Sequence, residues 1–210
     1  MNGRRIGRGR LKCRLKLKMR SWKSILPAGE RNYEMIVISA DQSTDAVAQL
    51  CPNCGLCCDS TLFADVELRA ADDAKRLQKL GLTIKQKTQT KLAFAQPCAC
   101  FDGKLCGIYG DRPKRCRRFE CGLLKRVEAD EMTAGAALKK ISEAKKRAEN
   151  VRGLLRQSGK GDEPMALTHR YAEAMSAPID MSGETDAERR GELMLAVNDL
   201  MTLLERDFLR

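Results

Sequence analysis

The stretch CPNCGLCC, residues 51–58, places four cysteines within eight positions. In a Cys-x-x-Cys-Gly turn two thiolates can converge on one ion, and the glycine supplies the positive φ that the turn needs. Cys51, Cys54 and Cys57 share one spacing, Cys-x2-Cys-x2-Cys, which also opens the ferredoxin pattern. Adjacent side chains tend to diverge, so we expect Cys57 and Cys58 to serve different metal ions or different atoms of one cluster.

A second block offers the additional ligands that such an arrangement requires. The five cysteines of this block lie within 24 residues and are Cys98, Cys100, Cys106, Cys116 and Cys121. When Cys13 near the N-terminus is set aside, nine thiols remain. Eight thiolates suffice for two tetrahedral sites with four ligands each, and the ninth thiol is then a bystander.

The segment before the first block contains no uninterrupted apolar region that resembles a secretory signal. We therefore expect a cytoplasmic protein, in which clustered cysteines indicate metal ligands or redox groups rather than structural disulfides. The longest apolar stretch, near residues 35–40, is far short of the roughly 20 residues that span a bilayer. We expect no membrane helix and no membrane partner.

Both blocks together resemble the YkgJ-like CxxCxxCC cysteine-cluster family over about residues 50–125. CPNCGLCC matches the Cys-x2-Cys-x2-Cys-Cys signature, and CGIYGDRPKRCRRFEC is similar to the companion block Cys-x-Ile-Tyr-x-x-Arg-Pro-x-x-Cys-Arg-x-Phe-x-Cys. The resemblance implies a domain that chelates zinc or iron. Some members of the family are described as iron–sulfur proteins, and a related domain occurs in flagellin lysine methylases.

The resemblance also implies a set of ligands. These are Cys51, Cys54, Cys57, Cys58, Cys98, Cys106, Cys116 and Cys121. Cys100 departs from the family pattern, which has an apolar residue near this position, and it leaves open whether Cys98 or Cys100 is the ligand. We interpret Cys100 as a small buried hydrophobic residue and keep it as a candidate extra ligand.

The non-cysteine part of the second motif comprises Tyr109, Arg112, Pro113 and Arg117. Arg112, Arg117 and Arg118 could offset the charge of a thiolate cluster or bind an anionic ligand. Four thiolates on one Zn²⁺ leave a net charge of about −2, so nearby cations are expected on charge grounds alone. We therefore favour a supporting role for these residues, with Pro113 shaping the turn.

Charge is distributed unevenly along the chain. Residues 1–34 contain eleven Lys and Arg and two Glu, whereas the remainder is nearly neutral with 28 basic and 26 acidic residues. We interpret residues 1–34 as a disordered tail or as sequence outside the mature protein, with patterned sequence beginning at Met35. A basic arm for nucleic acid and a transit peptide remain the alternatives.

Hydrophobic periodicity predicts an α+β fold. We expect a loop-rich, metal-stabilised cysteine-cluster domain over residues 35–125, followed by a helical C-terminal segment over residues 126–210. The expected elements are a strand within 62–68, a helix within 69–82, one or two strands within 82–95, loops over 97–121, and helices over 127–157, over 165–175 and from the N-cap Thr185 onward.

The sequence favours a metal-binding protein that holds zinc or iron through the two cysteine blocks. The alternative is an iron–sulfur protein, in electron transfer or as the cofactor domain of an enzyme such as a protein lysine methylase. Whether the chain is an enzyme stays open, because the only histidine, His169, lies outside the motifs and no Cys–His nucleophile pair forms without it. Nucleic acid is disfavoured except through the basic tail, and an unidentified protein partner remains open.

Overall fold

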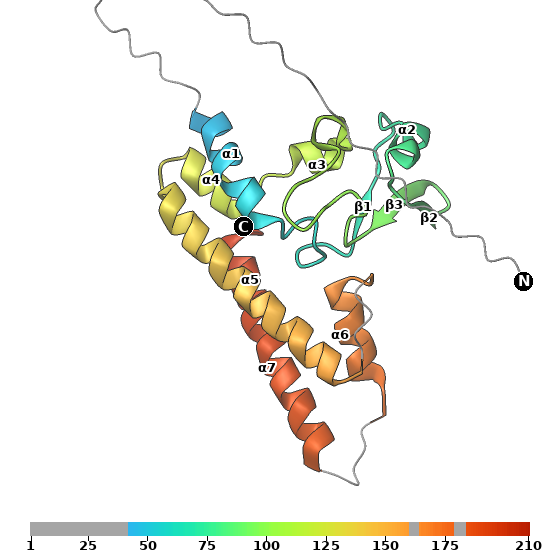
Figure 1. Cartoon of the computed structure of the whole chain (residues 1–210), viewed down its shortest axis with the longest axis vertical. Helices are drawn as coiled ribbons and strands as arrows, with labels where there is room; N and C mark the ends of the chain where they lie inside the picture. The colour runs from blue at the N-terminus through green and yellow to red at the C-terminus, as the bar shows by residue number, and fades with distance from the viewer. Residues whose placement is uncertain (1–41, 160–163, 179–183) are drawn as a thin grey trace, which may run out of the picture. The chain divides into compact units, whose positions relative to one another are not determined.

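The computed structural model describes residues 42–159, 164–178 and 184–210. The basic segment 1–34, the expected onset of patterned sequence at Met35, and Cys13 therefore lie outside the described residues. The structure is mixed α+β, with a small three-stranded antiparallel sheet and long C-terminal helices (Figure 1), and this confirms the predicted fold class.

The first described helix, α1 (Gln42–Cys54), carries Cys51 and Cys54 on its last turn. The next residue, Gly55, has φ of +76°, which is the left-handed conformation that glycine adopts without strain. The positive φ predicted for this glycine is thus confirmed. The residues immediately before it are helical, so the first two thiols are presented by a helix end.

The sheet has the strand order β1-β3-β2, and both pairings are antiparallel. Its strands are β1 (Asp65–Glu67), β2 (Ile84–Thr88) and β3 (Lys91–Ala95). The strands expected within 62–68 and 82–95 are therefore confirmed, the latter as a hairpin. Phe94 lies opposite both Val66 and Ile84, and these side chains pack with Leu77 and Leu82 into a small apolar cluster that we call the sheet core.

A short helix, α2 (Ala74–Lys79), connects β1 to β2. It is shorter than the expected range 69–82 because Asp73 ends the preceding turn as the N-cap, accepting the N–H of Arg76 at 3.0 Å. Beyond the sheet, residues 97–121 are mainly turns, as predicted. They include a short 3-10 turn, η1 (Tyr109–Asp111), and one helical turn and a half, α3 (Lys114–Arg118).

Four helices follow the second cysteine block: α4 (Gly122–Glu128), α5 (Ala134–Gln157), α6 (Leu167–Ser176) and α7 (Glu184–Asp207). The single helix expected over 127–157 is divided, because Asp130 adopts φ of +56° and interrupts it before Thr133 caps α5. The short helix expected over 165–175 is confirmed by α6. The prediction of Thr185 as an N-cap is wrong, since α7 begins at Glu184 and Thr185 lies inside it.

The main core lies between α5 and α7, which run alongside each other (Figure 1). The face of α5 includes Ala137, Ala144 and Ala148, all fully buried, and these small side chains admit the leucines of α7 such as Leu193 and Leu200. The face of α7 that enters this core includes Leu193, Leu200, Leu204 and Phe208, with Val197 partly buried against it.

The same core also contains residues of the first cysteine block. Ala46 and Leu50 on α1 and Leu56, which follows Gly55, pack against α4, α5 and α7. The described residues from Gln42 onward belong to one compact unit. The division into segments 35–125 and 126–210 stays a prediction. Among the described residues, no helix combines the length and the apolar character needed to cross a lipid bilayer.

One buried carboxylate fixes the end of α7 to the rest of the core. The side chain of Asp207 is 1% exposed and accepts hydrogen bonds from Arg206 at 2.8 Å, Lys140 at 3.0 Å and Arg126 at 3.1 Å. Burial alone would raise the pKa of Asp207, but these three cations outweigh it and lower the pKa from 3.8 to about 2. The carboxylate therefore stabilises the fold in its ionised form.

Replacing this carboxylate provides a test of its contribution. We expect Asp207→Asn to lower the free energy of unfolding by about 1–2 kcal/mol at pH 7, because three cations lose their common partner. Since the folded-state pKa is depressed, the stabilisation is complete above about pH 4 and is lost as the pH falls towards 2. Urea denaturation of both proteins across this range measures the difference. Asp199→Asn is the matched control, since Asp199 is 74% exposed and should change stability by less than about 0.5 kcal/mol; equal losses in both variants would contradict the prediction.

Candidate metal centre

The cysteines of the two blocks interleave in the fold. Cys51 and Cys54 lie one helical turn apart at the end of α1, and Cys57 follows the turn at Gly55. Cys121 occupies the N-cap position of α4, which packs against α1. Cys54 and Cys121 both pack on the main core, although they are 67 positions apart in the sequence.

The electrostatics of these four thiols show that they are neighbours. The pKa is raised to about 11 at Cys51 and to about 12 at Cys54, chiefly by burial, with negative charge at Cys57 and Cys121 contributing at both. Burial also raises the pKa of Cys121, with Cys57 adding to the rise. We call Cys51, Cys54, Cys57 and Cys121 the helix group.

A second set of thiols gathers on the sheet core. Cys98 is buried there, and its N–H donates to the carbonyl of Cys58 at 2.8 Å. Cys58 and Cys116 pack against the same cluster. Cys106 forms an isolated β-bridge with Phe101, whose ring also contacts the sheet core. We call Cys58, Cys98, Cys106 and Cys116 the sheet group.

The thiols of the sheet group also raise one another's pKa values. Burial raises the pKa of Cys98 to about 11 and that of Cys116 to about 12. At Cys98 the negative charges of Cys100 and Cys106 add to the rise, and at Cys116 those of Cys57, Cys98 and Cys106 add to it. The pKa of Cys58 is raised by its hydrogen bond with Cys57, by burial, and by the charges of Cys57, Cys98 and Cys106.

The two groups meet at the adjacent cysteines. The Sγ atoms of Cys57 and Cys58 are 3.9 Å apart. Their hydrogen bond lowers the pKa of Cys57 while it raises that of Cys58, so Cys57 is the thiol of this pair that ionises more readily. Cys57 also raises the pKa of Cys116 across the boundary.

The donor set suits zinc or iron, because thiolates are the ligands that both metals accept in all-cysteine sites. Within the described ranges, however, no three Cys, Asp, Glu or His side chains are already arranged to hold a metal ion. The eight implied ligands and their division between two sites therefore stay a prediction, which the chemistry of the thiolate donors supports.

Cys100 lies at the margin of the sheet group. Its thiol donates a hydrogen bond to the carbonyl of Leu80 at 3.3 Å, and it packs against the sheet core. Burial raises its pKa. A hydrogen bond between the two thiols lowers the pKa of Cys100 and raises that of Cys98, so Cys100 stays a candidate extra ligand beside Cys98.

Arg112 is the motif arginine whose charge acts on the thiols. Burial raises the pKa of Cys51 and Cys116, and the positive charge of Arg112 opposes that rise at both. The guanidinium lies 3.7 Å from the ring centroid of Tyr109, and its Nε–H donates to the Tyr109 carbonyl at 3.0 Å. Pro113 is buried and immediately precedes α3.

The other motif arginines differ from Arg112. Arg117 and Arg118 are exposed on α3, and neither side chain forms a hydrogen bond or an ion pair with another residue in the described part of the chain. Of the three arginines expected to support the thiolates, only Arg112 is therefore placed so that its charge lowers the pKa of thiols in both groups.

Residues on α5 hold the first block in place, and no pattern in the sequence predicts these contacts. Arg152 donates to the carboxylate of Asp59 at 3.1 Å and to the hydroxyl of Thr61 at 2.9 Å, directly after Cys58. Lys145 donates to the carbonyl of Asn53 at 3.3 Å. These contacts join positions about ninety residues apart, which local patterning does not reveal.

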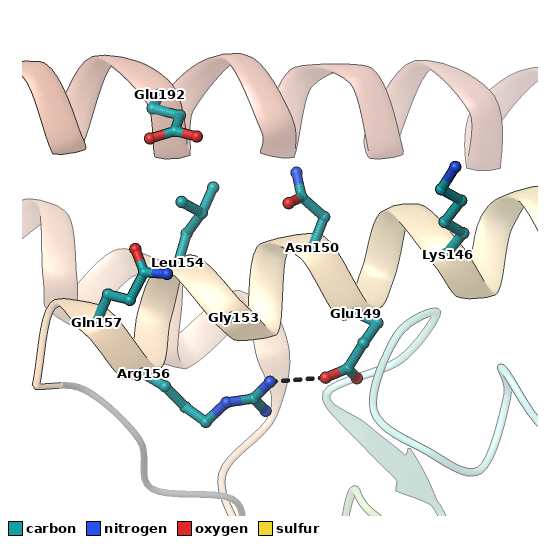
Figure 2. Close-up of a pocket in the computed structure, with 8 residues that line it drawn as sticks. All are labelled: Lys146, Glu149, Asn150, Gly153, Leu154, Arg156, Gln157 and Glu192. Atoms are coloured by element: carbon teal, nitrogen blue, oxygen red, sulfur yellow. Dashed lines mark hydrogen bonds and ion pairs between the residues drawn. The ribbon is translucent and has the colours of Figure 1, made fainter.

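A cavity of about 550 Å³ between α5 and α7 lies apart from the cysteines (Figure 2). Leu154 points towards α7, and Glu149 pairs with Arg156 at 2.7 Å. Lys146 and Arg156 are balanced by Glu149 and Glu192, so the cavity has no preference for a charged ligand.

Two groups of gathered thiols define a cysteine-rich metal-binding domain. Residues 50–149 match the model of the CxxCxxCC family, which is described as a "putative zinc- or iron-chelating domain". The matched range contains all eight implied ligands, and it confirms the resemblance inferred from the sequence. No curated protein and no solved structure matches the chain.

The position of Arg112 generates a prediction for metal release. Its charge favours the thiolate form, so we expect Arg112→Gln to release bound zinc or iron at a higher pH during acidification, with the midpoint raised by about 0.3–0.5 pH. A chromogenic chelator, added to samples at a series of pH values, measures the pH at which half of the metal is released. Arg117→Gln makes the same change of charge five positions away and should leave the midpoint unchanged; a matching shift in that control would rule out a specific role for Arg112.

Proposed function

We propose that the chain is a metal-binding protein that holds zinc or iron at two sites, one in each group of thiolates. Cys51, Cys54, Cys57 and Cys121 would hold one metal ion. Cys58, Cys98, Cys106 and Cys116 would hold the other. Arg112 would lower the cost of the negative charge at both sites.

The observation that carries this proposal is the boundary between Cys57 and Cys58. Cys57 is an electrostatic neighbour of Cys51, Cys54 and Cys121, whose pKa values it raises. Cys58 is hydrogen-bonded through its carbonyl to Cys98 on the other core. In the proposed arrangement each half of the adjacent pair would complete a set of four, which is the number of ligands in a closed zinc site.

Two closed tetrathiolate sites would be structural, because no coordination position is left for water or substrate. Such sites would contribute to folding directly, since metal binding and folding are then coupled. This suits a domain whose sheet core is small and whose chain contains 4% aromatic residues.

An iron–sulfur cluster is the second candidate, and one specific observation favours it. Cys51, Cys54 and Cys57 keep the Cys-x2-Cys-x2-Cys spacing of ferredoxins, and Cys121 lies near them as a fourth thiolate. In this case the helix group would hold the cluster. The protein would then transfer electrons or act as the cofactor domain of an enzyme.

Metal content decides between these candidates. We expect protein purified without oxygen or added metal to contain about two zinc ions per chain and no visible absorption band. Iron with acid-labile sulfide and a broad band near roughly 400 nm would instead establish the cluster. A protein that contains neither metal and binds neither would refute both.

Single substitutions test the division of ligands. We expect Cys121→Ser and Cys116→Ser each to lower the metal content by about half, because each removes one ligand from a different group. Cys100→Ser is the control and should keep the full content, since Cys100 is bonded to Leu80 instead. Loss of all metal in either single variant, or loss in the control, would show that the groups are not divided as proposed.

A further inference from the structure

A second cavity, of about 750 Å³, lies on the side of α3 that faces the end of β1. Its size is in the range of small-molecule sites. Ala70 and Ala71 line it on one side, and their short side chains leave the space open. It contains none of the cysteines and is separate from both thiol groups.

The walls of this cavity are tied together by one carboxylate. Asp72 accepts the backbone N–H of Arg69 with one oxygen and that of Lys114 with the other, both at 2.8 Å. This arrangement fixes the turn after β1 against the start of α3. Each oxygen of Asp72 therefore has a backbone donor.

Four cations line the cavity, and these are Arg69, Lys114, Arg115 and Arg118. Arg115 pairs with Glu67 at 3.2 Å. The side chains of the other three form no hydrogen bond or ion pair with any residue that the structure describes. No acidic residue lines the cavity, which contrasts with the balanced charges between α5 and α7 in Figure 2.

The remaining wall is apolar. Phe119 lines the cavity and is half-buried, and its ring is held edge-on against Phe63 with centroids 4.9 Å apart. α3 places Lys114, Arg115 and Arg118 towards the cavity, while Cys116 packs on the sheet core. One short helix thus separates a thiol-lined side from a cationic side.

We propose that this cavity binds a small organic molecule that carries a diphosphate group. Arg69 and Arg118 can each form paired hydrogen bonds with phosphate oxygens, and Lys114 adds a point charge. Phe119 offers an apolar surface to the organic part. This site goes beyond the proposed metal binding and does not depend on which metal the cysteines hold.

Calorimetric titration of the full-length, metal-loaded protein with inorganic pyrophosphate at low ionic strength tests the proposal. We expect saturable binding that weakens with added salt. The double variant Arg69→Gln/Arg118→Gln should weaken binding about tenfold or more, because two charged hydrogen-bonding partners are lost. Arg118→Lys keeps the positive charge but lacks the planar guanidinium that forms paired hydrogen bonds. We therefore expect an intermediate loss of affinity for pyrophosphate.

A control variant must distinguish binding of pyrophosphate in this cavity from its nonspecific attraction to the positively charged chain. Lys125→Gln/Lys139→Gln removes the same charge from exposed positions on α4 and α5, and it should leave the affinity for pyrophosphate unchanged. Metal content and circular dichroism of both double variants confirm folding. Absence of pyrophosphate binding, or equal weakening in the two double variants, would overturn the proposal.

Discussion

Thiols that lie close together in a partly buried place cannot all ionise without a cation to compensate them. Burial is the first cause that raises the pKa of Cys54 and Cys116, and the charges of neighbouring cysteines add to it. Arg112 offsets a part of this charge, and a bound metal ion would offset the larger part. Without such a cation, the buried thiols of both blocks therefore favour the neutral, protonated form.

The helices provide the rigid support for this arrangement. Arg152 and Lys145 on α5 bond to the residues on either side of the first cysteine block. The end of α7 supports the other block, where the N–H of Gly122 donates to the carbonyl of Phe208 at 2.8 Å. A Cβ atom at Gly122 would lie 2.9 Å from the carbonyl oxygen of Asp207, so only glycine permits this approach beside Cys121.

The sequence predicted those features that depend on local patterning. The α+β class, the strands within 62–68 and 82–95 and the positive φ of Gly55 all follow from periodicity or from glycine. The partners of each thiol did not follow, because Cys121 joins Cys51 from a distance of 70 positions. The contact between Arg152 and Asp59 could not be predicted for the same reason. The interruption between α4 and α5 could not be predicted either, because it occurs at Asp130, a non-glycine residue that adopts a positive φ.

The short separation of the Cys57 and Cys58 sulfur atoms has a consequence for the order of metal loading. Four protonated thiols are neutral, whereas the same four carry a net charge of about −2 once they hold a divalent ion as thiolates. On electrostatic grounds, the first metal ion would therefore make the ionisation of the adjoining group more costly. The two proposed sites would be anticooperative, with unequal affinities, and scarce metal would yield chains that are half filled.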